Sequence, residues 1–285
     1  MIDDPTVARR DDILPSLPRL TESHRLGLQF APISKGTARG QQGEQQDRQG
    51  AFHRQSPSIS VIVTTAPAFL FDLDGTLADT LPDLTASANH VRGLYGLAPI
   101  TQAKVRTFIG DGARALVRRA LDEQAPEQAA LDAAVAAYID HHEDQCTREC
   151  RLFEGVELFI RHLREQGHPI AIVTNKPERF ARPVIAHLGL DAITSVVVGG
   201  DTLATKKPDP EMLQHALDQL DVTAAGATMI GDGIQDLRAG KALGVRTVAC
   251  LFGYGNPAAL REEGADAFWS AFGVDHEPRP SGGRG

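Results

Sequence analysis

The chain has 285 residues, of which 42% are hydrophobic and 23% are charged, and its formal net charge is −8. This composition predicts a soluble protein of one or two domains with a substantial core, and the negative charge argues against a nucleic-acid-binding protein, because no basic excess is present to neutralise phosphates. No apolar run is long enough to span a membrane, and three cysteines are too few for a disulfide scaffold.

The first 66 residues differ from the rest of the chain in composition. Residues 34–58 are rich in Gly, Gln, Arg and Ser and hold almost no large apolar side chain. Such a segment cannot bury enough apolar surface to offset its ordering entropy, so we predict a disordered extension over 1–66. No secretory signal or transit peptide is predicted. One hypothesis is that translation starts downstream, near Val61 or Val63. The tail 275–285 is predicted to be flexible.

Short apolar runs that suit buried parallel strands alternate with helical patterns after residue 67. Apolar residues at helical spacing predict a helix near 212–220, with Asp209 as its cap and Pro210 in its first turn. A second helix near 234–243 is predicted to end at Gly244. The predicted strands are 68–72, 170–174, 193–198, 227–231 and 245–251.

The alternation of strands and helices predicts an α/β fold with a doubly wound parallel sheet. One long interruption, from 82 to 150, has a helical pattern throughout. We predict an all-helical domain inserted after the first strand, here called the helical insertion, that lies over the carboxyl edge of the sheet. The α/β core is then expected to comprise residues 67–81 and 151–274.

The strongest motif lies at the end of the first predicted strand, in the sequence FDLDGTL. Asp72 and Asp74 leave the strand two residues apart, and Gly75 permits a sharp turn beside them. Asp72 could ligate a metal and attack an electrophile, while Asp74 could act first as general acid and then as general base. A strand followed by an Asx-type turn is the plainer explanation of two such carboxylates.

Two further motifs supply groups that suit a phosphate. Thr174, Asn175 and Lys176 end the second predicted strand, where a hydroxyl and successive backbone N–H groups can bind phosphoryl oxygens. Lys207 precedes Pro208, which fixes the backbone so that the ammonium group can be held towards the sheet edge. Each motif alone is explained as well by an ordinary turn or an exposed lysine.

The fourth motif is GDGIQD, at the end of the predicted strand 227–231. Asp232 and Asp236 place two carboxylates near the same edge as Asp72. Clustered oxygen ligands suit a hard cation such as Mg²⁺. Capping of the following helix by Asp232 is the structural alternative.

Taken together and in this order, the four motifs resemble the haloacid dehalogenase-like (HAD) superfamily over residues 67–274. The resemblance implies that Asp72 forms an aspartyl-phosphate and that Asp74 protonates the leaving group and later activates water. It also implies that Thr174 and Lys207 bind the phosphate. The residues that it implies for Mg²⁺ are Asp72, the backbone carbonyl of Asp74, Asp232 and, as an outer partner, Asp236.

The substrate is suggested by strings similar to those of bacterial phosphoglycolate phosphatases, a group of this superfamily with a C1-type helical cap. This similarity implies hydrolysis of 2-phosphoglycolate, whose carboxylate could be bound by Arg114, Arg118 or Lys176. Gly233 departs from the family pattern, in which Ser or Thr is common at this position. We expect altered bonding around the site there rather than lost activity.

Other functions remain open from the sequence. The alternatives are a phosphatase for another small ester such as a sugar phosphate, a phosphosugar mutase, and a non-catalytic binding module, which the complete motif set disfavours. We expect a small-molecule phosphate ester as partner, with no nucleic acid and no membrane. An odd number of cysteines suits a reducing compartment, so a cytoplasmic protein is expected.

A separate pattern places His142, Cys146 and Cys150 at intervals of four residues. On one helix face they would offer three zinc ligands. His142 also continues an apolar stripe through Val135 and Ile139, and a buried cysteine behaves as a small hydrophobic residue. We therefore favour core packing for these three side chains.

Overall fold

The computed structural model describes residues 66–121, 127–194 and 196–273. The predictions for the N-terminal extension up to residue 65 and for the tail 275–285 lie outside the described residues. In the described part of the chain, no helix combines the length and the apolar character needed to cross a membrane.

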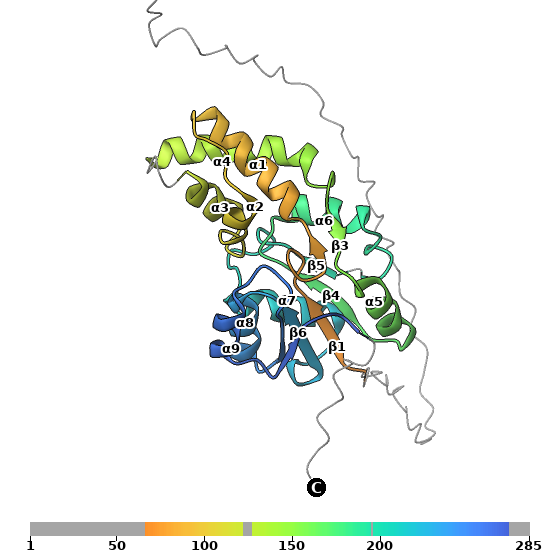
Figure 1. Cartoon of the computed structure of the whole chain (residues 1–285). Helices are drawn as coiled ribbons and strands as arrows, with labels where there is room; N and C mark the ends of the chain where they lie inside the picture. Colours follow the sequence, from red (N-terminus) through yellow and green to blue (C-terminus); the bar gives the residue numbers. More distant parts are fainter. Residues whose placement is uncertain (1–65, 122–126, 195, 274–285) are drawn as a thin grey trace, which may run out of the picture. The chain divides into compact units, whose positions relative to one another are not determined.

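A parallel sheet forms the centre of the described core (Figure 1). Its strand order is β5-β4-β1-β6-β7-β8, so the strand that carries the FDLDGTL motif lies in the interior of the sheet. The strands of this sheet are β1 (Ala68–Phe71), β4 (Ile170–Val173), β5 (Val196–Val198), β6 (Ala227–Gly231), β7 (Arg246–Cys250) and β8 (Ala267–Trp269).

Five of these strands were predicted, with small differences at their ends. The prediction for β5 began at residue 193, whereas residues 191–194 form a turn in which Thr194 N–H donates to the carbonyl of Leu190 at 3.2 Å. Strand β8 was missed, because it has three residues and follows polar sequence. It pairs in parallel with β7, with Trp269 opposite Cys250.

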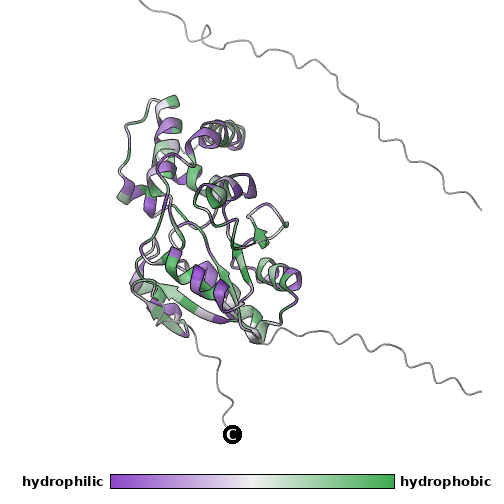
Figure 2. Cartoon of the chain, turned by 90° about the vertical axis from the view of Figure 1, so that its right-hand side faces the viewer, coloured by the Kyte–Doolittle hydropathy of each residue, from purple (hydrophilic) through white to green (hydrophobic). Residues whose placement is uncertain are grey.

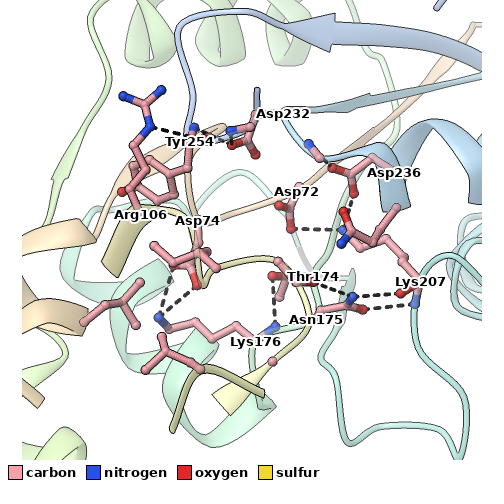
Figure 3. A pocket seen from close by; sticks show the side chains of 18 of the residues that line it. Asp72, Asp74, Arg106, Thr174, Asn175, Lys176, Lys207, Asp232, Asp236 and Tyr254 are labelled. Carbon is pink, nitrogen blue, oxygen red and sulfur yellow. Dashed lines mark hydrogen bonds and ion pairs between the residues drawn. The ribbon is translucent and has the colours of Figure 1, made fainter. Parts of the chain in front are cut away.

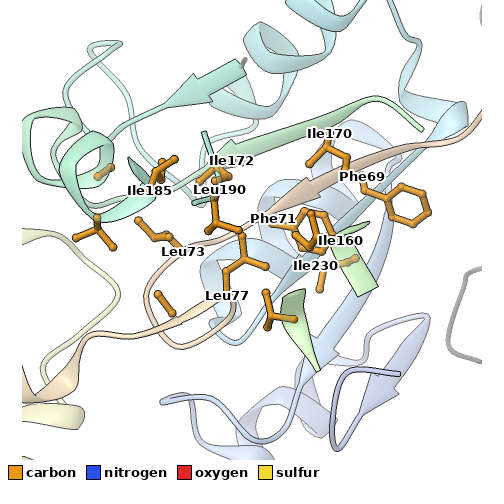
Figure 4. Close-up of a cluster of buried hydrophobic side chains, with 14 of the residues drawn as sticks. Phe69, Phe71, Leu73, Leu77, Ile160, Ile170, Ile172, Ile185, Leu190 and Ile230 are labelled. Carbon is orange, nitrogen blue, oxygen red and sulfur yellow. The ribbon is translucent and has the colours of Figure 1, made fainter. Parts of the chain in front are cut away.

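Alternating side chains of the strands fill two hydrophobic layers, one on each face of the sheet. Phe69 and Phe71 point into the layer covered by α5 (Val156–Glu165) and α6 (Glu178–His187), part of which Figure 4 shows. Ala68 and Leu70 point into the opposite layer, covered by α7 (Glu211–Leu220) and α8 (Ile234–Leu243).

The distribution of hydropathy agrees with these two layers. In Figure 2 the strands are mostly green and hydrophobic, whereas the helices alternate between green and purple segments. Such alternation is typical of helices with one buried and one exposed face. The remaining short helices of the core are α9 (Pro257–Glu263) and the 3-10 turn Ala224–Gly226.

The two predicted helix boundaries are close to those of the structure. Helix α7 begins at Glu211, and its backbone N–H donates to the Asp209 carboxylate at 2.9 Å, with Pro210 at the cap position. Helix α8 ends at Gly244, whose φ of 75° is the left-handed conformation that glycine adopts without strain.

Between β1 and β4 the chain forms the helical insertion, which Figure 1 shows on the side where β1 ends. A short antiparallel pair, β2 (Ala78–Asp79) and β3 (Arg151–Leu152), brings its two connections together. The insertion has a hydrophobic cluster of its own, which includes Leu116 and Tyr138. Its helices are α1 (Leu81–Leu94), α2 (Gln102–Arg106), α3 (Ala113–Ala120) and α4 (Gln128–Gln145).

Candidate active site

A cavity of about 560 Å³ lies between the carboxyl ends of the strands and the helical insertion. Its floor brings together residues from all four motifs, although these are up to 164 positions apart in the chain (Figure 3). The predicted site residues that line it are Asp72, Asp74, Thr174, Asn175, Lys176, Lys207, Asp232 and Asp236.

Lys207 is the central cation of this floor. Its Nζ donates to Asp72 Oδ1 at 3.0 Å, to Asp236 Oδ1 at 2.5 Å and to the carbonyl oxygen of Val173 at 2.6 Å. Burial alone would lower the pKa of Lys207, but the charges of Asp236 and Asp72 outweigh it and raise the pKa above its ordinary value. Lys207 is therefore a fixed positive charge beside the candidate nucleophile.

Three carboxylates crowd together next to Lys207. One oxygen from each of Asp72, Asp232 and Asp236 lies within 4.8 Å of the others. Burial and the neighbouring carboxylates raise the pKa of Asp232 to about 7. Burial raises the pKa of Asp236 to about 6, although Lys207 opposes the rise. More negative charge is gathered here than one lysine neutralises, and this all-oxygen donor set fits Mg²⁺.

Asp232 is held in this cluster by hydrogen bonds from a loop after β7. Its Oδ2 accepts from the backbone N–H of Tyr254 at 2.6 Å and of Gly255 at 3.2 Å, and its Oδ1 accepts from the Thr76 hydroxyl at 3.0 Å. Gly75 has a φ of 89°, and a Cβ there would overlap the Asp232 carboxylate. The glycine of the DLDG motif thus makes room for a second carboxylate as well as for the turn.

The side chain of Asp74 is turned away from the three-carboxylate cluster (Figure 3). Its Oδ1 accepts from the Thr80 hydroxyl at 2.7 Å, and Lys176 Nζ lies 3.1 Å from both carboxylate oxygens. Asp72 and Asp74 therefore have different surroundings, although they are two residues apart. Such a separation allows one carboxylate to be a nucleophile and the other an acid and base.

Asn175 connects the phosphate-binding motifs. Its side-chain amide donates to the carbonyl of Lys207 at 2.9 Å and accepts from the Lys207 N–H at 3.0 Å. The same amide donates to the carbonyl of Gly110 in the helical insertion at 2.8 Å. Thr174 is buried, and its hydroxyl accepts from the Lys176 N–H at 3.2 Å. The Asn175 side chain is thus occupied in positioning the Lys207 loop.

The two arginines expected to read the substrate do not line the cavity. Arg114 lies on α3 and pairs with Asp132 of α4 at 2.6 Å, with both side chains partly exposed. Arg118 is exposed on the same helix. The face of α3 that reaches the cavity carries Ala113 and Leu116 instead, because the apolar side chains of this amphipathic helix point inward. Of the three predicted specificity residues, Lys176 alone is among the lining residues of the described chain.

Arg106 and Tyr254 line the cavity and were not singled out from the sequence. Arg106 of the insertion donates through Nε to the carbonyl of Tyr254 at 3.1 Å and through a terminal nitrogen to the carbonyl of Gly253. The Tyr254 hydroxyl accepts from the Thr80 N–H at 2.7 Å and donates to Asp79 at 3.0 Å. Burial raises the pKa of this hydroxyl, which stays protonated. Tyr254 belongs to the sequence FGYGN, which follows β7.

Gly233 is the N-cap of helix α8, and its N–H donates to the Asp236 carboxylate at 2.9 Å. This backbone bond does not depend on a side chain at position 233. The sequence predicted altered bonding here because glycine lacks the hydroxyl of the Ser or Thr that is common at this position. The backbone N–H of Gly233 nevertheless holds the Asp236 carboxylate.

His142, Cys146 and Cys150 are all buried. Both cysteines belong to the core layer beneath α5 and α6, as the packing interpretation expects. His142 lines the cavity. His142 thus belongs to the buried face of α4 and also forms part of the cavity wall.

Residues 69–250 match the family model described as haloacid dehalogenase-like hydrolase. The chain belongs to this family. The resemblance found in the motifs is therefore confirmed, and so is the α/β core with a parallel sheet.

Individual relatives point the same way. The chain is 42% identical over 211 residues to a phosphoglycolate phosphatase of Cupriavidus necator, a match that covers 73% of this chain and 91% of the relative. It is 35% identical over 214 residues to an N-acetylmuramic acid 6-phosphate phosphatase of Pseudomonas aeruginosa, covering 74% and 91%. The prediction of a phosphoric monoester hydrolase is confirmed by the family and these relatives.

Among solved structures, one of a protein described as a predicted phosphoglycolate phosphatase from Haemophilus somnus is similar, with a TM-score of 0.69 and 28% identity. The match covers 74% of this chain and 96% of that protein. The similarity thus extends over nearly all of the solved chain.

Proposed function

We propose that this chain is a Mg²⁺-dependent phosphatase that hydrolyses 2-phosphoglycolate to glycolate and phosphate through an aspartyl-phosphate intermediate. The observation that carries the proposal is the position of Asp72, 3.0 Å from Lys207 Nζ, with the separately held carboxylate of Asp74 in the same cavity. A nucleophile, a fixed cation and an acid–base group are the parts that this reaction needs.

In the first step the phosphoryl group binds between Lys207, the Thr174 hydroxyl and the following backbone N–H groups. An Asp72 oxygen attacks phosphorus, and the bond between phosphorus and the ester oxygen breaks. Asp74 gives its proton to the departing oxygen of glycolate. The charge of Lys207 offsets the repulsion between an anionic nucleophile and a phosphate dianion.

In the second step water attacks the phosphorus of the aspartyl-phosphate. Asp74, now a carboxylate, takes a proton from this water, and the bond between phosphorus and the Asp72 oxygen breaks. Asp72 and the protonated Asp74 are thereby regenerated. Two carboxylates with different surroundings divide one difficult displacement into two easier ones.

The residues that would hold the metal are Asp72, Asp232 and the backbone carbonyl of Asp74, with Asp236 behind them. The raised pKa values of Asp232 and Asp236 support this assignment, because burial and the neighbouring carboxylates disfavour their charged forms when no cation of the described chain other than Lys207 is near. When bound, Mg²⁺ supplies neutralising charge for the phosphate and the nucleophile.

The helical insertion, residues 82–150, is proposed as a C1-type cap domain that excludes water from the site. Contacts to the core support this role: Gly110 accepts from Asn175 at 2.8 Å, and Asp111 accepts from Gln235 at 2.7 Å. The insertion also supplies apolar walls to the cavity from Leu84, Ile109 and Leu116. A dry cavity strengthens the electrostatic interactions within it.

A second candidate substrate is a sugar phosphate. The relative named N-acetylmuramic acid 6-phosphate phosphatase and the cavity of about 560 Å³ favour it, because phosphoglycolate is a much smaller molecule. The identity of 42% to a phosphoglycolate phosphatase favours the smaller ester.

The test is phosphate release from 2-phosphoglycolate, from sugar phosphates including N-acetylmuramic acid 6-phosphate, and from an aryl phosphate. Each substrate is assayed with and without Mg²⁺, and D72N is the blank. We expect the highest Mg²⁺-dependent kcat/KM with phosphoglycolate. Preference for a sugar phosphate would keep the mechanism and replace the substrate. Conversion of a phosphosugar without phosphate release would indicate a mutase instead.

A further inference from the structure

His142 of α4 lines the cavity and carries a polar atom without a partner among the described residues. Its side chain lines the cavity and is 1% exposed, and its Nε2 has no hydrogen-bond partner in the part of the chain that the structure describes. Leaving a buried donor or acceptor unpaired costs about 1–3 kcal/mol. The missing hydrogen-bond partner of a ring nitrogen in the wall of a binding site can be supplied by a bound molecule.

The ring of His142 is fixed on three sides. Tyr138 stacks on it with ring centroids 5.1 Å apart, and Phe180 packs edge-on at 4.8 Å. Its Nδ1 lies 2.8 Å from the Ser87 hydroxyl of α1. These three contacts hold the ring in one orientation, so little side-chain freedom is lost when a molecule binds there.

The charge state and the proton position of His142 follow from its neighbours. Burial and the nearby ammonium of Lys176 lower the pKa of His142 to about 2, so the ring is neutral. Ser87 Oγ also lies 3.1 Å from His141 Nδ1. When His141 donates to Ser87, the Ser87 hydroxyl donates to His142 Nδ1, and the proton of His142 then resides on Nε2. Nε2 is a donor in this arrangement.

We propose that His142 Nε2–H, together with Lys176, binds the carboxylate of 2-phosphoglycolate. The inference rests on the proposed function and deepens it by naming the residue that recognises the part of the substrate outside the phosphate. A neutral donor beside a cation suits an anionic acceptor. Leu84, Leu116 and Phe180 line the same cavity, and these apolar side chains offer no competing donor to that carboxylate.

The test compares 2-phosphoglycolate with ethyl phosphate, which lacks the carboxylate, in wild type, H142L and H142Q. H142L should lower kcat/KM for phosphoglycolate about 10- to 100-fold more than for ethyl phosphate, because a hydrogen bond to a charged group is lost. H142Q keeps an amide near the position of Nε2 and should restore part of the ratio of kcat/KM for phosphoglycolate to kcat/KM for ethyl phosphate. S87A should also lower this ratio, through a higher KM for phosphoglycolate, since Ser87 is a positioning residue.

H187L is the control. His187 is an exposed histidine at the end of α6 that does not line the cavity, and its loss should leave the ratio at the wild-type value. Equal losses of both substrates in H142L would mean a structural role and overturn the inference. A larger loss with 2-hydroxyethyl phosphate than with phosphoglycolate would make Nε2 an acceptor and also overturn it. A wild-type enzyme that fails to hydrolyse phosphoglycolate would refute the proposed function before any variant is compared.

Discussion

Lys176 and Asp74 form an ion pair inside the cavity, with Lys176 Nζ 3.1 Å from both oxygens of the Asp74 carboxylate. Their side chains are 3% and 12% exposed. The pair joins the loop after β4, which carries the candidate phosphate ligand Thr174, to the candidate acid and base. Lys176 is therefore placed to orient Asp74, in addition to the role in binding the substrate that is proposed for it.

K176M should lower kcat/KM for phosphoglycolate by about 100-fold, because it removes a buried partner of the acid–base group and a cation facing the substrate. Steady-state kinetics checks this. K206M is the matched control, since Lys206 is exposed and does not line the cavity. A K176M enzyme as active as K206M would contradict the role given to this ion pair.

K207M should abolish turnover and lower the free energy of unfolding by about 3 kcal/mol, because Asp72 and Asp236 lose the cation between them. The double variant K207M/D236N should regain part of that stability without regaining activity, since one of the unpaired carboxylates is removed. Urea unfolding of the metal-free proteins measures both effects. Strictly additive losses in the double variant would show that Lys207 and Asp236 do not interact.

The metal site should be sensitive to acid. The folded-state pKa values of about 7 for Asp232 and about 6 for Asp236 lie above 3.8, the ordinary value of an aspartate. The folded state therefore binds more protons than the unfolded state between these values, and the metal-free protein loses stability as the pH rises from about 4 to about 7. Protons and Mg²⁺ compete for these oxygens, so Mg²⁺ affinity should fall as pH drops below about 7.

Thermal unfolding with and without Mg²⁺ at about pH 5.5 and about pH 8 measures this competition. The increase of Tm by Mg²⁺ should be clearly larger at the higher pH, and D232N should abolish it. An increase of the same size at both pH values would mean that these carboxylates do not hold the metal.

The sequence predicted that the side chains of the floor meet at one edge of the sheet, because most of them follow a short apolar strand directly. Parallel strands that end at one edge bring Asp72, Thr174 and Asp232 together whatever their separation in the chain. The glycine at position 75 likewise has a local signature. The order of the strands and the pairing of Lys207 with Asp236 were not predicted from the sequence and are seen in the structure.

The walls of the cavity could not be predicted in the same way. Arg114 and Arg118 have the right charge for a carboxylate but lie on a face of α3 that does not reach the cavity. His142 continues an apolar stripe, and this pattern does not show that the stripe ends at a cavity. Arg106 donates to backbone carbonyls of a loop about 150 residues away. Every residue has a backbone carbonyl, so the sequence does not show which ones an arginine will contact.

R106A should lower kcat/KM about fivefold and increase hydrogen exchange in α2, because the bonds from the insertion to the loop at Gly253 and Tyr254 are lost. The effect is modest because Arg106 is exposed. R114A is the control, since Arg114 pairs with Asp132 within the insertion. If R114A raised KM for phosphoglycolate selectively and R106A changed nothing, the arginine of α3 would be the functional one after all.

The central claim is that Asp72 carries the phosphoryl group during turnover. The most direct measurement is rapid acid quench of the working enzyme with 2-phosphoglycolate and Mg²⁺, followed by mass spectrometry of its peptides. We predict a phosphoryl group on the peptide that contains Asp72, formed before steady state and absent from D72N. Phosphate release by D72N, or turnover by the wild type with no phosphorylated Asp72 at any quench time, would contradict the account.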